Sequence, residues 1–325
     1  MRVAVYLPLL FPLLAALIAR PAGERLPPRQ ATWLLTVGAL VLAAGSTAVL
    51  GMLAITGLIR IPLLARLAHD HWSAHAAQSH DPAAFSTAVL AGLLLAVAAA
   101  MAGRLLWRRA RALADCATEA ACLPGRDQLV VVEDRAAEAY ALPGRPGRIV
   151  VSTGMLEALD PAEREILLAH ERAHLGHHHY LFVAFAQLAA AANPLLRPLA
   201  DTVGYTVERW ADESAAAATG SRERVARTIG KAAIAAKRTR ARNRQPLFGF
   251  LGAAAARGVL DRLRPGGTGP VPRRVTALLA PRRRGHLLSS SALIVLLIAT
   301  GLCAAEASHD LESLLELTKR TVSRG

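Results

Sequence analysis

The sequence predicts a mainly α-helical integral membrane protein, with four transmembrane helices and a cytoplasmic α+β domain between the third and fourth helices. Two observations favour this fold class. Hydrophobic residues make up 53% of the 325 residues and charged residues only 19%, whereas soluble domains usually carry about 25% charge. The apolar residues also gather in four stretches without charge, and a segment with strand and helix patterns separates the last two.

The four uncharged stretches have the length of membrane spans. A helix needs roughly 20 apolar residues to cross about 30 Å of hydrocarbon. The first stretch could instead be a cleavable signal peptide, but Pro8 and Pro12 interrupt it and its end is a poor cleavage site. We therefore expect a membrane region at residues 1–103 and a separate fourth span. The predicted spans are residues 3–19, 31–59, 82–103 and 287–305.

The arginines predict the orientation of these spans. Cytoplasmic loops of membrane proteins carry an excess of Lys and Arg, which places the first loop and residues 104–286 in the cytoplasm. The N-terminus and a short tail at 306–325 are then external. The net charge of +14 is explained by this topology and by contact with anionic lipid. We expect no direct binding of nucleic acid, because no aromatic residues interleave with the basic run at 237–244.

The cytoplasmic segment changes from strand patterns to helix patterns. Three short segments at 129–133, 138–142 and 148–152 predict a small sheet. Asp160, with Pro and Glu at the first and third positions after it, then forms a capping-box pattern that starts a helix. We predict a folded domain at 104–235. An Arg-, Gly- and Pro-rich stretch at 236–286 is expected to be a loosely structured, basic juxtamembrane linker.

The predicted helix after Asp160 carries the motif His170-Glu171-Arg172-Ala173-His174. Residues four apart lie on one face of a helix, so both imidazoles can reach one Zn²⁺ ion. Glu171 stands beside them and can take a proton from a water molecule that the metal activates. The sequence therefore predicts one zinc ion per chain, with His170 and His174 as ligands and Glu171 as the general base. The three histidines that follow, His177–His179, are expected to be solvated or membrane-facing.

A catalytic zinc ion usually has three protein ligands, so a second helix should supply one more. The predicted helix at 201–219 offers Glu208 as this ligand. Asp212 lies one turn later, where it can accept the free N–H of a ligand histidine and fix its tautomer. An apolar segment at 181–196, too short for a span, is expected to form a buried or membrane-surface helix.

These motifs together resemble the BlaR/MecR family of membrane zinc metallopeptidases. The resemblance rests on the His-Glu-x-x-His helix, the apolar helix with Asn193-Pro194, the helix with Glu208 and Asp212, and the strand before the motif. It implies three spans, a cytosolic zincin-like peptidase domain and a fourth span. HtpX/Ste-type peptidases share the zinc signature and are the close alternative. Antibiotic-sensing members carry a penicillin-binding sensor domain after the fourth span, and only a short tail follows here.

The expected function is zinc-dependent cleavage of a protein or peptide on the cytoplasmic side of the cell membrane. The resemblance implies a role in signalling, in some members through cleavage linked to a cytosolic repressor of the penicillinase-repressor type. One alternative is a non-catalytic membrane scaffold with a structural zinc site, and another is an HtpX-like quality-control peptidase. A transporter is disfavoured, because the four predicted spans contain no Asp, Glu, Lys or Arg.

The strand that precedes the zinc-binding helix suggests how a substrate could be aligned. If Ile149, Val150 and Val151 form the sheet edge beside the zinc ion, their backbone groups can pair with an extended peptide. We therefore predict a substrate-binding edge strand at these residues; the alternative is an interior strand that only supports the helix.

Overall fold

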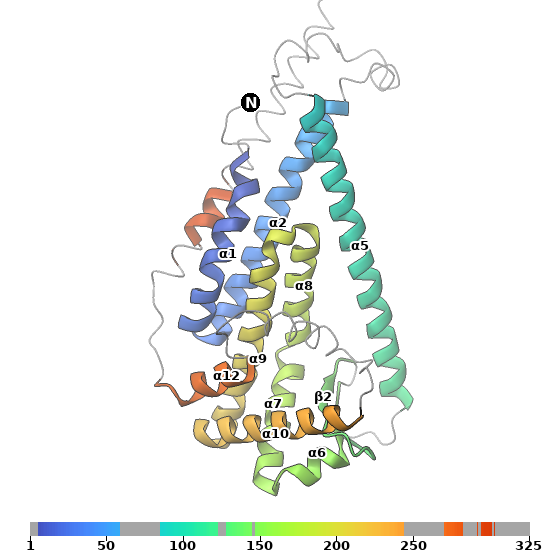
Figure 1. Ribbon diagram of the computed structural model, residues 1–325, viewed down its shortest axis with the longest axis vertical. Helices are drawn as coiled ribbons and strands as arrows, with labels where there is room; N and C mark the ends of the chain where they lie inside the picture. Colours follow the sequence, from blue (N-terminus) through green and yellow to red (C-terminus); the bar gives the residue numbers. More distant parts are fainter. Residues whose placement is uncertain are drawn as a thin grey trace, which may run out of the picture.

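The computed structural model describes residues 6–58, 85–122, 128–144, 147–243 and 270–281, together with 291, 294–300 and 302. Within this part of the chain, three helices are long and apolar enough to cross a membrane. They are α1 (Leu7–Arg25), α2 (Pro28–Leu58) and α5 (Phe85–Cys122). In Figure 1, α1 and α2 lie in the upper part of the molecule, and α5 runs from the top down to the level of the sheet. The three N-terminal stretches predicted as spans are thus confirmed as apolar helices of sufficient length.

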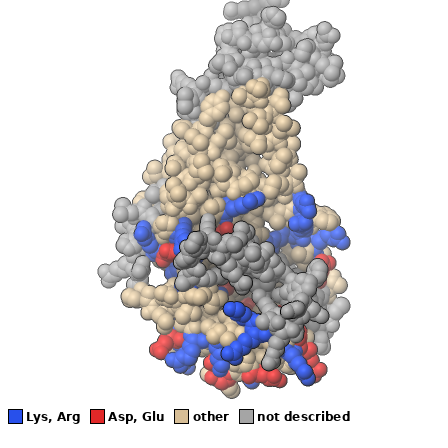
Figure 2. Space-filling view, in the orientation of Figure 1, with Lys and Arg blue, Asp and Glu red and all other residues tan. Residues whose placement is uncertain are grey.

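The fourth predicted span and the predicted external tail lie largely outside the described residues. Residues 294–300 are helical, and Leu296 packs into the same core cluster as α1 and α2 residues such as Ala15 and Leu35. The tail at 306–325 is not described. On the face shown in Figure 2, the upper part of the described surface shows no Lys, Arg, Asp or Glu, whereas the lower part is densely charged.

A helical hairpin packs between the long apolar helices. It consists of α8 (His179–Ala192), the short turn η2 (Pro194–Leu196) and α9 (Arg197–Thr219), and it contacts α1, α2 and α5 (Figure 1). At its tip, Asn193 accepts a hydrogen bond from the Leu195 N–H and donates one of 3.0 Å to Ser46 Oγ on α2. The expected short apolar helix is therefore buried against the long helices.

In the described part of the chain, the small sheet has three strands in the order β1-β3-β2. Strand β1 (Leu129–Val132) pairs with β3 (Arg148–Ser152) in parallel, and β2 (Ala139–Leu142) pairs with the other side of β3 in antiparallel orientation. The prediction that Ile149, Val150 and Val151 form the sheet edge is therefore wrong. Strand β3 is central and buried along its whole length, so its backbone groups are already paired on both sides.

The helix after the sheet begins where the sequence predicts. A short helix, α6 (Thr153–Ala158), leads into α7 (Pro161–Gly176). The Asp160 carboxylate accepts a hydrogen bond from the Glu163 N–H, and the Glu163 carboxylate accepts one from the Asp160 N–H, both at 2.9 Å. The predicted capping box is confirmed, and it satisfies two N–H groups that the first helical turn leaves unpaired.

The expected loosely structured linker at 236–286 is helical at both of its described ends. Helix α10 (Arg222–Asn243) continues eight residues into it, and α12 (Pro270–Leu279) forms a further helix. Arg222 fixes the end of α12 by donating hydrogen bonds to the Ala280 and Ala277 carbonyls, at 2.7 and 3.1 Å. Apolar residues of α12 also pack against α9 and α10, which explains why the basic residues 270–279 form a helix. Residues 244–269 and 282–286 lie outside the described chain.

Candidate metal centre

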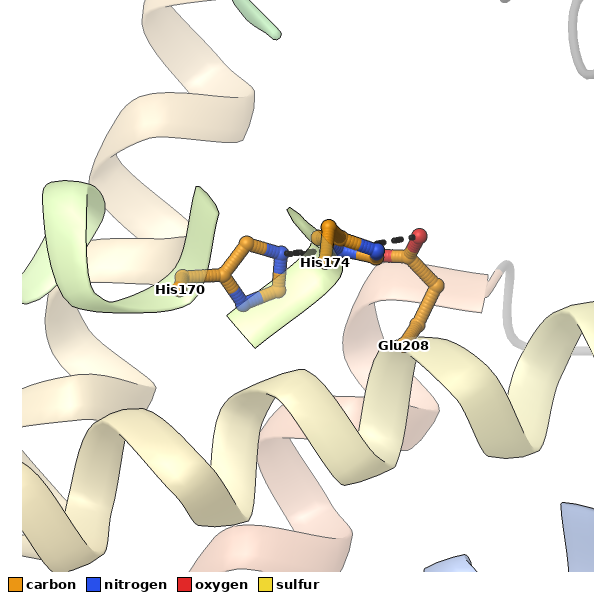
Figure 3. A group of neighbouring side chains, drawn as sticks. All are labelled: His170, His174 and Glu208. Carbon is orange, nitrogen blue, oxygen red and sulfur yellow. Dashed lines mark hydrogen bonds and ion pairs between the residues drawn. The ribbon is translucent and has the colours of Figure 1, made fainter. Parts of the chain in front are cut away.

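Helix α7 brings His170 and His174 together on one face. Their Nε2 atoms are 3.1 Å apart, and both side chains are largely buried. Figure 3 shows the two rings converging on the same point as the carboxylate of Glu208. The separation of four residues, a little more than one helical turn, thus produces the juxtaposition that the sequence predicts.

Helix α9 supplies the carboxylate of Glu208 from the opposite side. Each histidine Nε2 lies 3.7 Å from one Glu208 oxygen, and the three donor atoms fall within 4.8 Å of one another. Zinc bonds of about 2.0–2.1 Å at tetrahedral angles place neighbouring donors roughly 3.3 Å apart. Two imidazoles and one carboxylate are also donors that zinc accepts, so these residues fit a zinc ion.

Glu171 lies beside the two histidines and is buried, with a relative exposure of 8%. Burial raises the pKa of its carboxyl group, while the His170 charge and a backbone hydrogen bond from Ala141 on β2 oppose this shift. The backbone contact directs the Glu171 side chain toward the sheet edge formed by β2. A carboxyl group with a raised pKa suits proton transfer near neutral pH.

Asp212 stands behind His170, as expected from the sequence. Its Oδ1 lies 3.0 Å from His170 Nδ1, and its side chain is 1% exposed. Burial lowers the pKa of His170, but Asp212 and Glu208 outweigh this effect and raise it to about 10. A histidine that binds a metal must be neutral, so metal binding at His170 would displace the proton from Nε2 while Nδ1 stays beside the Asp212 carboxylate.

Arg274 also belongs to this centre, and sequence reasoning missed it. Its Nε and Nη2 atoms donate to the two Asp212 oxygens at 2.8 and 2.6 Å, and its Nη1 lies 2.8 Å from Glu208 Oε2. Burial raises the pKa of both carboxyl groups, but Arg274 and the histidines hold them below their ordinary values. The sequence signals only the helix that carries it, because Val271, Val275 and Leu278 follow helical spacing.

The expectation that His177–His179 are solvated or membrane-facing is wrong for His179. This residue is 1% exposed, and its Nδ1 lies 3.1 Å from His174 Nδ1. The chain turns at His178, whose φ of 51° is left-handed, so α8 starts with His179 directed back toward α7. His177 and His179 both contact the Trp210 ring, at centroid distances of 4.7 Å. Burial lowers the pKa of His179 to about 3, which keeps its ring neutral.

One family model matches the chain. Residues 106–206 match the model described as Peptidase family M48. The matched region runs from α5 into α9 and includes His170, Glu171 and His174, whereas Glu208, Asp212 and Arg274 follow it. No curated protein and no solved structure matches the chain. Peptidases of this family are metallopeptidases, so the match and the three apolar helices together support a membrane-associated metallopeptidase.

Proposed function

We propose that the protein is a membrane-embedded zinc endopeptidase with one zinc ion per chain, held by His170, His174 and Glu208. The observation that carries this proposal is the convergence of three donor atoms within 4.8 Å beside the buried Glu171. A zinc ion in this position would polarise the scissile carbonyl group and make water more acidic. Glu171 would accept a proton from the attacking water and pass it to the leaving amine.

Strand β2, rather than β3, is suited to align an extended substrate. Among the strands that the structure describes, β2 has a neighbour on one side only. The Ser152 N–H donates a hydrogen bond to the Glu138 carbonyl, so these two residues form a hydrogen-bonded pair. In an antiparallel ladder, hydrogen-bonded pairs alternate with pairs whose backbone groups point away from the partner strand. The backbone groups of Ala139 and Ala141 therefore point away from β3, and the Ala141 N–H already contacts Glu171. A substrate strand would pair with this edge next to the proposed general base.

Replacing Ala139 by Pro tests this alignment. The change removes one outward N–H without removing a bond to β3. A single lost hydrogen bond of about 0.5–1.5 kcal/mol corresponds to roughly 2- to 10-fold in kcat/KM. We expect this loss in a peptide-cleavage assay with normal zinc content. A Leu129→Ser variant at the other sheet edge should cleave as wild type does; equal losses in both variants would contradict pairing at β2.

We further propose that the active site faces the cytoplasm and that cleavage serves signalling, as in the BlaR/MecR-like arrangement. The arginine-rich ends of the apolar helices support this orientation. A cytosolic repressor of the penicillinase-repressor type is one protein substrate that such a site would reach. A reporter domain fused after Arg111 should then be cytoplasmic, and one fused after Ser79 should be external. The reverse result would exclude a cytosolic substrate.

Metal analysis of the purified protein tests the ligand set. Wild type and Glu171→Gln should each bind about one zinc ion per chain, whereas His170→Ala, His174→Ala and Glu208→Ala should each lose it. Asp212→Ala should weaken zinc binding by about 10- to 100-fold, the usual effect of losing a partner that orients a ligand. Full zinc retention in Glu208→Ala would remove this residue from the ligand set.

The main alternative is a membrane scaffold in which zinc is structural. A structural site usually has four protein ligands, whereas three donors converge here among the described residues. A structural site also has no use for a buried carboxyl group such as Glu171 beside its ligands. An HtpX-like quality-control peptidase would use the same residues on unfolded membrane proteins, and its substrates would distinguish it from a signalling peptidase.

A further inference from the structure

The second histidine of the motif needs a partner that Asp212 does not provide. His174 directs its Nε2 atom toward His170 and Glu208, each within 3.7 Å. If this nitrogen binds zinc, it carries no proton, and the single proton of the neutral ring lies on Nδ1. That N–H group then requires an acceptor inside the protein.

His179 is in the position to be this acceptor. Its Nδ1 lies 3.1 Å from His174 Nδ1, and no other partner of His174 Nδ1 is found among the described residues. If the Nδ1 atom of His179 accepts this hydrogen bond, the single proton of the neutral His179 ring lies on Nε2. That atom is buried and has no hydrogen-bond partner in the described part of the chain, so contact with His174 is the polar interaction that accounts for a histidine here.

We propose that His179 is a positioning residue for zinc, which accepts the Nδ1–H of His174 and so fixes the tautomer and ring orientation of this ligand. The inference rests on the proposed zinc site and deepens it. His170 and His174 would then have different partners, a carboxylate from Asp212 and a neutral imidazole from His179. The carboxylate makes His170 the stronger electron donor of the two ligands.

The ring of His179 is held by packing on elements outside the motif. It is the first residue of α8, follows the left-handed His178 and contacts the Trp210 ring on α9. Helix α8 in turn packs against α2 and α5. The orientation of one zinc ligand is thus linked directly to the hairpin that lies between the long apolar helices.

Substitutions at this position can separate the acceptor from the packing. Asn places an amide oxygen near the position of the His179 Nδ1 atom, Leu has a similar branched shape without an acceptor, and Phe keeps a ring without an acceptor. The full-length protein in detergent micelles is titrated with zinc against a competing chelator. The absorption spectrum of the Co²⁺-loaded protein reports the ligand geometry independently of activity.

We expect His179→Asn to bind zinc nearly as wild type does, and His179→Leu and His179→Phe to bind it about 10- to 100-fold more weakly with an altered Co²⁺ spectrum. A His177→Leu control, which also removes a contact with Trp210, should bind as wild type. Wild-type affinity in the Leu or Phe variant would overturn the proposal, and so would an equal loss in Asn and Leu. If the His179→Phe variant does not fold, the comparison of the His179→Asn and His179→Leu variants decides the test. Failure of the wild-type protein to bind zinc would instead refute the proposed function.

Discussion

Replacing Glu171 by Gln is expected to lower peptidase turnover by about 10²- to 10⁴-fold, the usual contribution of a general base. The amide has almost the same shape and can still contact the Ala141 backbone, but it cannot accept the proton from water at neutral pH. Zinc content and folding should be unchanged, because Glu171 is not among the three converging donors. The measurement is cleavage of a peptide library by purified protein, with zinc content determined on the same samples.

The matched control for this variant is Glu165→Gln on the same helix. Glu165 is exposed and lies away from the metal centre, so its neutralisation should leave turnover unchanged. If Glu171→Gln cleaves as fast as wild type, Glu171 is not the general base. If the variant loses zinc, the residue supports the metal rather than the proton transfer.

Replacing Arg274 by Ala is expected to destabilise the metal-free protein by about 3–5 kcal/mol. Breaking a buried ion pair leaves uncompensated charge in the interior, and here both Asp212 and Glu208 lose the same partner. Zinc should recover part of this loss, because its positive charge also compensates Glu208. The measurement is chemical denaturation of the full-length protein in micelles, with and without zinc.

The neighbouring arginine provides the control. Arg273 pairs with Glu24 at 2.7 Å, but both side chains are partly exposed, and such pairs contribute about 1 kcal/mol or less. Arg273→Ala should therefore have a small effect. A similarly small effect of Arg274→Ala would show that the buried Asp212 and the partly exposed Glu208 do not need this partner.

Local patterns predict the features that depend on neighbours in the sequence. The length of the uncharged stretches predicts α1, α2 and α5, and a single turn of helix brings His170 next to His174. The capping pattern at Asp160 likewise depends on four consecutive residues, 160–163. The position of Glu208 beside the two histidines could be anticipated only from chemistry. A catalytic zinc ion needs a third protein ligand, and a second helix has to supply it. These arrangements are present in the structure, while the catalytic roles remain proposals.

Features that depend on distant contacts could not be predicted in the same way. Arg274 lies 62 residues from Asp212, and its charge is indistinguishable in the sequence from other arginines that flank a span. The order of strands depends on how β1 and β2 both pair with β3, which the alternation of residues does not specify. The burial of His179 depends on one left-handed residue, His178, where the chain reverses direction.

The most direct test of the central proposal compares protein N-termini in cells that express wild type with those in cells that express Glu171→Gln at equal levels. A zinc endopeptidase that uses Glu171 should generate new N-termini in the wild-type cells that are absent with the variant. Cytosolic and membrane fractions are measured separately, so the location of the cleaved proteins also tests the proposed orientation. Identical sets of N-termini in both cells would contradict a proteolytic function for this site.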